Sequence, residues 1–411
     1  MRTASLSLGS RYRSGAPRAA APAGARHKIA ARRPVAAVLR AGLVLAGLAG
    51  CALAADARAQ SADWYVSPDG SDAAAGSRDA PLLTIAAAAQ RARPGSTIHV
   101  APGQYDGGFI TVASGTAEAP IHYLALVRGR ATIKPPRQSS REVAWENRGA
   151  YVVIDGFEVD GSEPHGGTPW RIGLYSTGSN SSIVNSDVHQ LARDVPCDSH
   201  GGAGIEGDSW TGGSNIALIG NVVHDVGPRA CKFIHGIYLT ASGTIANNLV
   251  YRVSGWGIHL WHDVHDVRVV NNTVFNSVAG GIVVGGGDYV HTKGPADRIV
   301  VANNIVFDNS GYGVIESGDT GPHNLFTHNL VYRNGIDWHL KTSAPDSAAI
   351  AADPGFVRYD RNGGGDYRPS PESPAIGAGS PEYAPALDLS GSTRRGGSTI
   401  GAFGRPVPRG H

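Results

Sequence analysis

The sequence predicts an all-β solenoid, in which short strands wind into coils that stack on one another. One pattern occurs twice within Cys231–Phe275: a strand of the form Gly-apolar-x-apolar, a turn, a second strand, an Asn-Asn corner and a third strand. A unit of this length cannot bury its own apolar face, so its repetition indicates that each coil covers the next. The composition agrees with this fold, because 56 of the 411 residues are glycine and only 17% are charged.

The same pattern continues along the chain in two aligned columns. The third strands align on valines that are 24 to 35 residues apart, namely Val159, Val188, Val223, Val250, Val274, Val306 and Val331. The corners before them carry Ser186, Asn221, Asn248, Asn272, Asn304 and Asn329. Asparagine tolerates a left-handed corner, and stacked asparagine amides can bond to one another along a column. We therefore interpret these residues as a structural ladder and not as ligands.

The first strands of the coils predict where a functional site lies. Side chains alternate along a strand, so if the apolar residue after each glycine points inward, the next residue points outward. This outward row is Tyr175, Glu206, Tyr238, His259, Val283 and Ile315. The middle of the row is polar and aromatic, and Asp208 and Trp261 share its face. By contrast, His189 and His224 stand where later coils carry Tyr or Phe, which predicts packing roles for both.

The segment before the coils predicts a cap. Trp64–Val66 is expected to be a strand, Thr84–Arg93 a helix that ends at Pro94-Gly95, and Thr97–Val100 a strand. A solenoid needs its open end covered, and a helix does this by hiding a strand edge.

This segment resembles the N-terminal cap of secreted right-handed parallel β-helix proteins of the pectate-lyase-like superfamily. The matching motifs are Tyr65-Val66-Ser67-Pro68, Gly70-Ser71-Asp72, Pro81, Thr84-Ile85, Pro94-Gly95, Thr97-Ile98 and Pro102-Gly103-Gln104-Tyr105. The resemblance implies a right-handed parallel β-helix whose polar face is a substrate groove. The Gly-, Pro- and Ser-rich end resembles the tail that closes many such proteins. We expect an export segment at 1–59, a cap at 60–110, coils at 111–342 and a closing tail at 343–411.

The first 59 residues predict export. They hold ten of the 36 basic residues and one acidic residue, followed by the apolar run Ala41–Ala54 and the small-residue site Ala57-Arg58-Ala59. The run is too short to span a membrane. Leu48–Cys51 resembles a bacterial lipobox, so the alternatives are a secreted or periplasmic protein and an outer-membrane lipoprotein anchored at Cys51. Either way we expect a monomer, with no nucleic-acid partner because the formal charge is only +2.

Two cysteines remain after the export segment, Cys197 and Cys231. A pair of cysteines in an exported chain indicates a disulfide, and their separation is close to one coil, so neighbouring coils can bring them together.

The first functional hypothesis is a polysaccharide lyase. Breaking a uronic-acid chain by β-elimination requires neutralising the carboxylate, removing the C5 proton and protonating the leaving oxygen. Lys232, His235, Tyr238 and His259 are the candidates for the proton transfers. Arg171 or Arg229 is the candidate for holding the carboxylate. Ca²⁺ could also neutralise it, although the Asp-rich signature of the calcium-dependent pectate lyases is not found in the sequence.

Two other hypotheses remain open. A glycoside hydrolase needs two carboxylates, which Glu206, Asp208 and Asp263 could supply. A non-catalytic glycan-binding protein would use Trp261 to stack on a sugar. In each case Tyr175 and His262 would line the substrate groove. We expect no protein-bound metal at these residues, because the histidines near Trp261 fall on a strand and its turn instead of one helical face.

Overall fold

The computed structural model describes residues 63–405 except 163–165, 293, 342 and 395–397. The predicted export segment and Cys51 lie outside the described residues. Within the described part of the chain, no helix is both long and apolar enough to cross a membrane.

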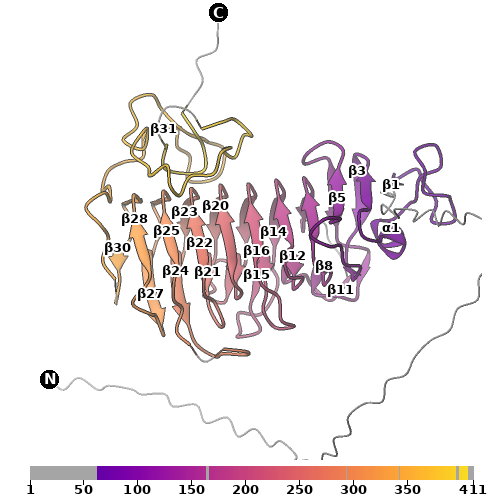
Figure 1. The fold of residues 1–411 in the computed structure, drawn as a ribbon, viewed down its shortest axis with the longest axis horizontal. Coiled ribbons are helices and arrows are strands. Elements are labelled where there is room, and N and C mark those ends of the chain that lie inside the picture. The colour runs from indigo at the N-terminus through magenta and orange to yellow at the C-terminus, as the bar shows by residue number, and fades with distance from the viewer. Residues whose placement is uncertain (1–62, 163–165, 293, 342, 395–397, 406–411) are drawn as a thin grey trace, which may run out of the picture. The chain divides into compact units, whose positions relative to one another are not determined.

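Three parallel sheets wind around one core (Figure 1). Sheet 1 contains β1 (Asp63–Val66), β2 (Thr97–Val100), β5 (Ile121–Ala125), β9 (Val152–Asp155), β13 (Ser182–Val184), β16 (Ile216–Ile219), β19 (Gly243–Ala246), β22 (Val267–Val270), β25 (Val300–Ala302) and β28 (Leu325–Thr327). Sheet 2 contains β3 (Gly103–Asp106), β6 (Ala131–Lys134), β10 (Glu158–Asp160), β14 (Asp187–Leu191), β17 (Val222–Val226), β20 (Leu249–Val253), β23 (Thr273–Ser277), β26 (Ile305–Phe307) and β29 (Leu330–Tyr332). Sheet 3 contains β4 (Phe109–Thr111), β8 (Val143–Asn147), β12 (Ile172–Ser176), β15 (Gly202–Gly207), β18 (Ile234–Leu239), β21 (Trp256–Leu260), β24 (Gly280–Gly286), β27 (Tyr312–Gly318) and β30 (Ile336–His339). The predicted all-β parallel solenoid is thereby confirmed.

Two small sheets complete the strands. β7 (Gln138–Ser139) pairs in parallel with β11 (Gly166–Gly167), and β31 (Phe356–Arg358) pairs antiparallel with β32 (Asp366–Pro369).

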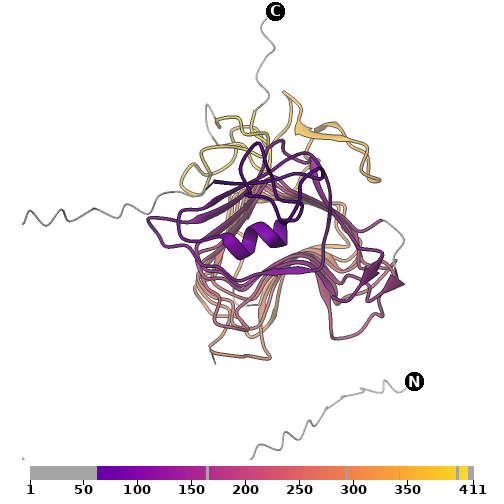
Figure 2. The same cartoon turned by 90° about the vertical axis from the view of Figure 1, so that its right-hand side faces the viewer.

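The described helix, α1 (Ile85–Arg91), covers the first coil, as the sequence predicted (Figure 2). Thr84 caps it, because its hydroxyl accepts a hydrogen bond from the amide of Ala87 at 3.1 Å. The helix buries Ile85, Ala88 and Ala89 against the core. The strands β2, β3 and β4 already belong to the three large sheets, so the coils begin inside the segment 60–110 that was expected to be the cap.

The valine column explains why the first strands need glycine. The seven predicted valines pair in register along sheet 2, and all are fully buried. A Cβ on Gly204 would lie 2.4 Å from Cγ1 of Val223, and a Cβ on Gly257 would lie 2.3 Å from Cγ1 of Val274. Both distances are too short for real side chains, so sheet 3 approaches sheet 2 only where glycine leaves room.

The predicted asparagine ladder is confirmed. From Asn221 to Asn329, each side-chain oxygen accepts hydrogen bonds from the residue one coil before it, at 2.9–3.1 Å. The expected left-handed corner was placed one residue too late. The residue with positive φ precedes the ladder residue, as in Asn247 (φ 55°) and Asn271 (φ 55°). The ladder position itself must project its amide into the corner, where the backbone groups of two coils need partners.

The closing tail docks on the outside of sheet 2. Its Tyr359 and Tyr367 pack on Phe275, which continues a stack of rings that runs through His189, His224 and Tyr251. The predicted packing roles of the two histidines are therefore confirmed.

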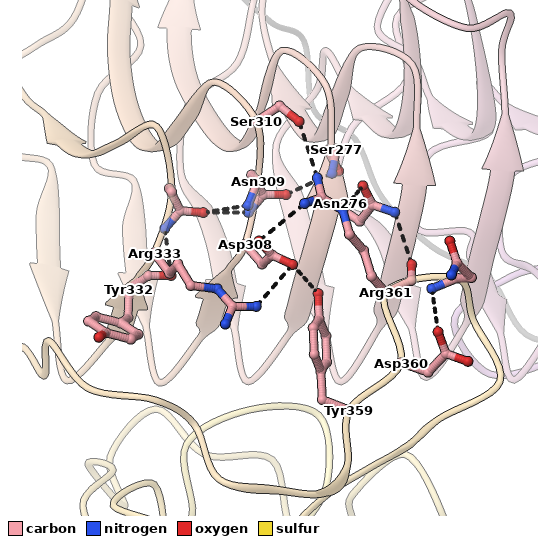
Figure 3. Close-up of polar contacts among 12 residues, drawn as sticks. Asn276, Ser277, Asp308, Asn309, Ser310, Tyr332, Arg333, Tyr359, Asp360 and Arg361 are labelled. Atoms are coloured by element: carbon pink, nitrogen blue, oxygen red, sulfur yellow. Dashed lines mark hydrogen bonds and ion pairs between the residues drawn. The ribbon is translucent and has the colours of Figure 1, made fainter.

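Polar contacts also hold the tail to the corner after sheet 2 (Figure 3). Asp308 accepts hydrogen bonds from the Tyr359 hydroxyl at 2.5 Å and from Arg361 at 3.3 Å, while Arg361 also donates to Asn276 at 2.9 Å. Arg333 forms an ion pair with Asp308 at 3.2 Å. The tail thus forms hydrogen bonds with turn residues of two successive coils, Asn276 and Asp308.

Candidate functional site

The outward row predicted on the first strands forms on sheet 3. The strand register pairs Tyr175 with Glu206, Glu206 with Tyr238, and Tyr238 with His259. His259 then pairs with Val283, where the row becomes apolar. Neighbouring strands lie about 4.8 Å apart, so these side chains are direct neighbours across three coils.

A cavity of about 570 Å³ opens over this row. The side chains of its floor and wall that can do chemistry are Glu206, Lys232, His235, Tyr238, His259 and Trp261. The loop that precedes β15 and the loop that precedes β18 form its rim, and they contribute His200 and Lys232. The disulfide Cys197–Cys231 joins these two loops, as the sequence predicted.

Two buried imidazoles lie in contact at the centre. Nδ1 of His259 is 2.9 Å from Nε2 of His235, so one ring donates a hydrogen bond to the other. Burial lowers the pKa of His235 to about 3. Burial and the neighbouring His235 and His262 hold the pKa of His259 well below its ordinary value. Both rings are therefore neutral at neutral pH, and an uncharged imidazole with a free nitrogen is a general base.

Tyr238 and Glu206 lie beside the imidazoles, and their pKa values are shifted upward instead of downward. The Tyr238 ring stacks on His259 with 4.9 Å between ring centroids. Burial and the nearby Glu206, Asp208 and Asp288 raise the pKa of Tyr238 well above its ordinary value. Burial, helped by Asp208, likewise raises the pKa of Glu206. The Tyr238 phenol therefore keeps its proton at neutral pH, and burial favours the protonated form of Glu206, so both groups can donate hydrogen bonds or protons to a bound substrate.

Asp208 and Asp263 are engaged in holding the walls of the site. Asp208 accepts hydrogen bonds from Tyr175, from Thr240 at 2.6 Å and from the amide of Trp210 at 3.0 Å. Asp263 is buried and accepts hydrogen bonds from three consecutive amides of the loop after β24, including that of Thr292 at 2.7 Å. Burial alone would raise the pKa of Asp263, but these donors lower it. Glu206 is the remaining carboxylate of the three that faces the cavity.

Comparison with known sequences agrees with this architecture. A family model described as "right handed beta helix region" matches residues 143–336, and one for a protein family of unknown function matches residues 68–109. Pectate lyase PEL9 of Emericella nidulans is 27% identical over 328 residues, which cover 66% of this chain and 73% of the relative. The uncharacterized protein YwoF of Bacillus subtilis is 27% identical over 129 residues, 30% of this chain and 28% of its own length.

The solved structure of pectate lyase Pel9A superposes with a TM-score of 0.57 at 19% identity, covering 84% of this chain and 96% of that structure. The chain has the right-handed parallel β-helix fold of this pectate lyase. A glycoside hydrolase also shares the architecture, with a TM-score of 0.51 at 9% identity over 71% of this chain and 96% of its own. At these identities the superpositions describe the fold and leave the chemistry to the residues of the site.

Several predicted residues lie outside the cavity of the β-helix. Arg171 is buried and holds the rim loop, through the carbonyl of Gly201 at 2.9 Å and Asp198 at 3.2 Å. Tyr175 points at Asp208, as described above. Arg229 is exposed and lines a different hollow, on the other side of the rim loop from Lys232.

Sequence reasoning missed two residues of the cavity. Trp256 lines it, at the start of β21. The strand register gives the reason, because Trp256 pairs with Gly280 and glycine leaves the space that the indole fills. Asp288 also lines the cavity and comes from the loop after β24. The backbone carbonyl of Asp288 lies 3.0 Å from Nδ1 of His262. This loop is longer than the corresponding loops of the other coils, so no column in the sequence marked its residues.

The donor set of the described residues offers no cluster of three or more His, Cys, Asp or Glu side chains for a metal ion. The calcium site of calcium-dependent pectate lyases is built from several carboxylates, and the carboxylates near this cavity do not fit that arrangement, since Asp208 and Asp263 are bound to the walls.

The buried imidazoles predict a loss of stability in mild acid. The pKa of His235 falls from 6.5 in the unfolded chain to about 3 in the folded protein. Below pH 6.5 the His235 side chain therefore binds a proton in the unfolded chain but not in the folded protein. The free energy of unfolding consequently declines as pH falls from about 6.5 toward 3. In urea titrations, His235→Gln is expected to show a shallower decline than the wild type between pH 6.5 and 4.5. Equal slopes in the two proteins would contradict the buried neutral state of His235.

The disulfide predicts a stability that depends on redox conditions. Cys197→Ser removes a cross-link between residues 34 apart in sequence and should lower the free energy of unfolding by about 2–4 kcal/mol. Chemical denaturation of the wild type with and without a reductant gives the comparison. The reductant should lower the stability of the wild type to that of the variant and leave the variant unchanged. A reductant effect that persists in the variant would refute the assignment.

Proposed function

We propose that the protein is an exported polysaccharide lyase that cleaves a uronic-acid chain by β-elimination. The similarity to pectate lyases supports a carbohydrate-active enzyme on a β-helix fold. The observation that supports β-elimination in particular is the stacking of His259 on Tyr238, which places a neutral base beside a protonated acid in one cavity. The disulfide supports export, because such bonds persist in oxidising compartments.

In the proposed reaction His259 is the base. When its Nδ1–H donates to Nε2 of His235, the lone pair of its Nε2 is free to take the C5 proton of the uronate. The electrons of the broken C–H bond form the C4–C5 double bond, and the bond from C4 to the glycosidic oxygen breaks. His235 thus acts as a positioning residue that selects the tautomer of His259.

Tyr238 protonates the leaving oxygen. Its raised pKa keeps the phenol protonated until the oxygen departs, and the resulting phenolate then recovers a proton from the His259 imidazolium. The return is downhill because the environment raises the pKa of one group and lowers that of the other. Base and acid project from adjacent strands of one face, so both act on the same side of the sugar ring. The site therefore favours a uronate whose C5 hydrogen and C4 oxygen lie on the same side.

The uronate carboxylate has two partners in this proposal. Lys232 is exposed at the rim and brings a positive charge to the cavity. Glu206, protonated through burial, donates a hydrogen bond that stabilises the negative charge developing on the carboxylate. The hydrolase alternative has less support, because Asp208 and Asp263 are committed to Thr240 and the loop amides.

A substrate panel tests the proposal. The protein is incubated with pectate, mannuronate-rich alginate, guluronate-rich alginate and glucuronate-containing polymers, each with added calcium and with a chelator. Absorbance of the unsaturated product is expected for at least one polymer. Reducing ends without this absorbance would establish hydrolysis instead. Binding without cleavage of any polymer would leave a glycan-binding protein.

A further inference from the structure

A second hollow, of about 390 Å³, lies at the corner between sheets 2 and 3. It is separated from the catalytic cavity by the loop that follows β17, which runs from Gly227 to Phe233. One side of this loop, with Pro228 and Arg229, lines the hollow, and the other side, with Lys232 and Phe233, lines the cavity. The disulfide at Cys231 fixes the loop between them.

Three arginines converge on this hollow from successive coils. Arg193 follows β14, Arg229 follows β17 and Arg252 lies on β20, and these strands are neighbours in sheet 2. The one acid in the lining is Asp225, which forms an ion pair with Arg252. Arg193 contacts only Gln190, at 2.7 Å, and the guanidinium of Arg229 has no hydrogen bond or ion pair among the described residues. The hollow therefore carries a net positive charge with at least one unpaired cation.

The same corner already acts as a docking surface further along the chain. There the tail places Arg361 on Asn276 and Asp308, and Tyr359 on Asp308 (Figure 3). Asn276 and Arg252 share the left-handed turn conformation, with φ values of 51° and 53°. The tail also reaches Arg252, because a Cβ on Gly363 would lie 3.1 Å from its guanidinium carbon. The hollow borders this docking surface, since Asn276 lines the hollow and also bonds to Arg361 of the tail.

We propose that this hollow is an accessory groove that binds the carboxylates of a polyuronate chain outside the catalytic cavity. Successive coils lie about 4.8 Å apart, and three of them each contribute one cation to the hollow, which suits a polymer with a repeating charge. Arginine binds carboxylates through two parallel N–H donors. Val226, Val253 and Val278 form an apolar floor for the carbon faces of the sugars. A second contact on the same polymer raises the local concentration of chain at the cavity.

The choice of a polyuronate rests on the proposed function. The test therefore measures binding alone, by affinity electrophoresis of the full chain through gels that contain polygalacturonate or alginate, in the His259→Ala background to prevent cleavage. Arg229→Ala and Arg193→Ala are each expected to raise Kd up to about fivefold, with a smaller effect at high salt. The matched control is Arg78→Ala, which removes the same charge from the exposed surface of the cap. Arg229→Lys should retain part of the affinity.

Each outcome has one meaning. The proposed groove would be refuted if Arg229→Ala and Arg193→Ala leave the affinity unchanged. It would also be refuted if Arg78→Ala lowers the affinity as much as they do. Retardation in a parallel gel that contains a sulfated polymer, and not in the polyuronate gels, would overturn the choice of ligand. If the groove variants bind more weakly but the wild-type protein cleaves no polymer, the groove is supported and the proposed function is refuted. Cleavage with unchanged affinity of the groove variants would do the reverse.

Discussion

Replacing His259 by alanine is expected to lower kcat on the cleaved polyuronate by about 10²- to 10⁴-fold. The side chain is the proposed base, and the remaining histidine of the pair, His235, is buried. KM should change little, because the carboxylate is held by Lys232 and Glu206. The measurement is the initial rate of unsaturated product, together with a thermal unfolding curve that confirms the variant is folded.

Three comparisons make this result specific. His265→Ala is the matched control, since His265 is a partly exposed histidine that pairs with Asp266 at 2.8 Å outside the cavity. Tyr238→Phe removes only the proton donor and should produce a loss of the same order as His259→Ala. Glu206→Gln keeps a hydrogen-bond donor where the protonated acid stood, so its loss should be about tenfold or less. A Glu206→Gln variant that is inactive beside an active His259→Ala would favour the hydrolase.

Replacing Asn272 by alanine is expected to lower the free energy of unfolding by about 2–5 kcal/mol. Asn272 is fully buried, and its side-chain oxygen accepts hydrogen bonds from the backbone and side-chain amides of Asn248 at 2.9 Å. Its side-chain nitrogen donates to the carbonyl of Ile245 at 2.9 Å and to Asn304 at 2.9 Å. Alanine leaves these partners buried without a hydrogen bond, because the corner is closed on both sides by coils.

The control for this variant is Asn362→Ala, at an exposed position of the tail where the side chain makes no hydrogen bond among the described residues. It should alter stability by less than about 0.5 kcal/mol. Urea titrations of the two variants give the comparison. Similar stabilities would show that the ladder forms without contributing to folding.

The columns of this fold could be predicted from the sequence because each has a simple physical cause. Valine at Val223 and glycine at Gly204 are two sides of one close approach, so both recur through the central coils. The outward row followed from strand alternation, and the register confirms that Glu206, Tyr238 and His259 are neighbours. The catalytic roles within that row stay a prediction.

Other features depend on contacts that no repeat encodes. Arg171 and Arg229 are near the site in sequence, yet the first is buried beneath the rim and the second lies beyond it. Asp263 looked like a candidate acid, and only the path of the inserted loop reveals its backbone partners. Loops of different lengths have no column to align with, so their side chains could not be placed from periodicity.

The closing tail changes how the molecule should come apart. A solenoid whose coils touch only their neighbours can melt stepwise from an end. Here single tail residues reach back to distant coils: Leu389 accepts from Arg128 at 3.2 Å, Leu387 from Asn247 at 2.7 Å and Ser380 from Asn303 at 2.8 Å. Coils far apart in the stack are thereby tied through one segment. Unzipping from the C-terminal end must first release these ties, so the stack should unfold as one cooperative unit.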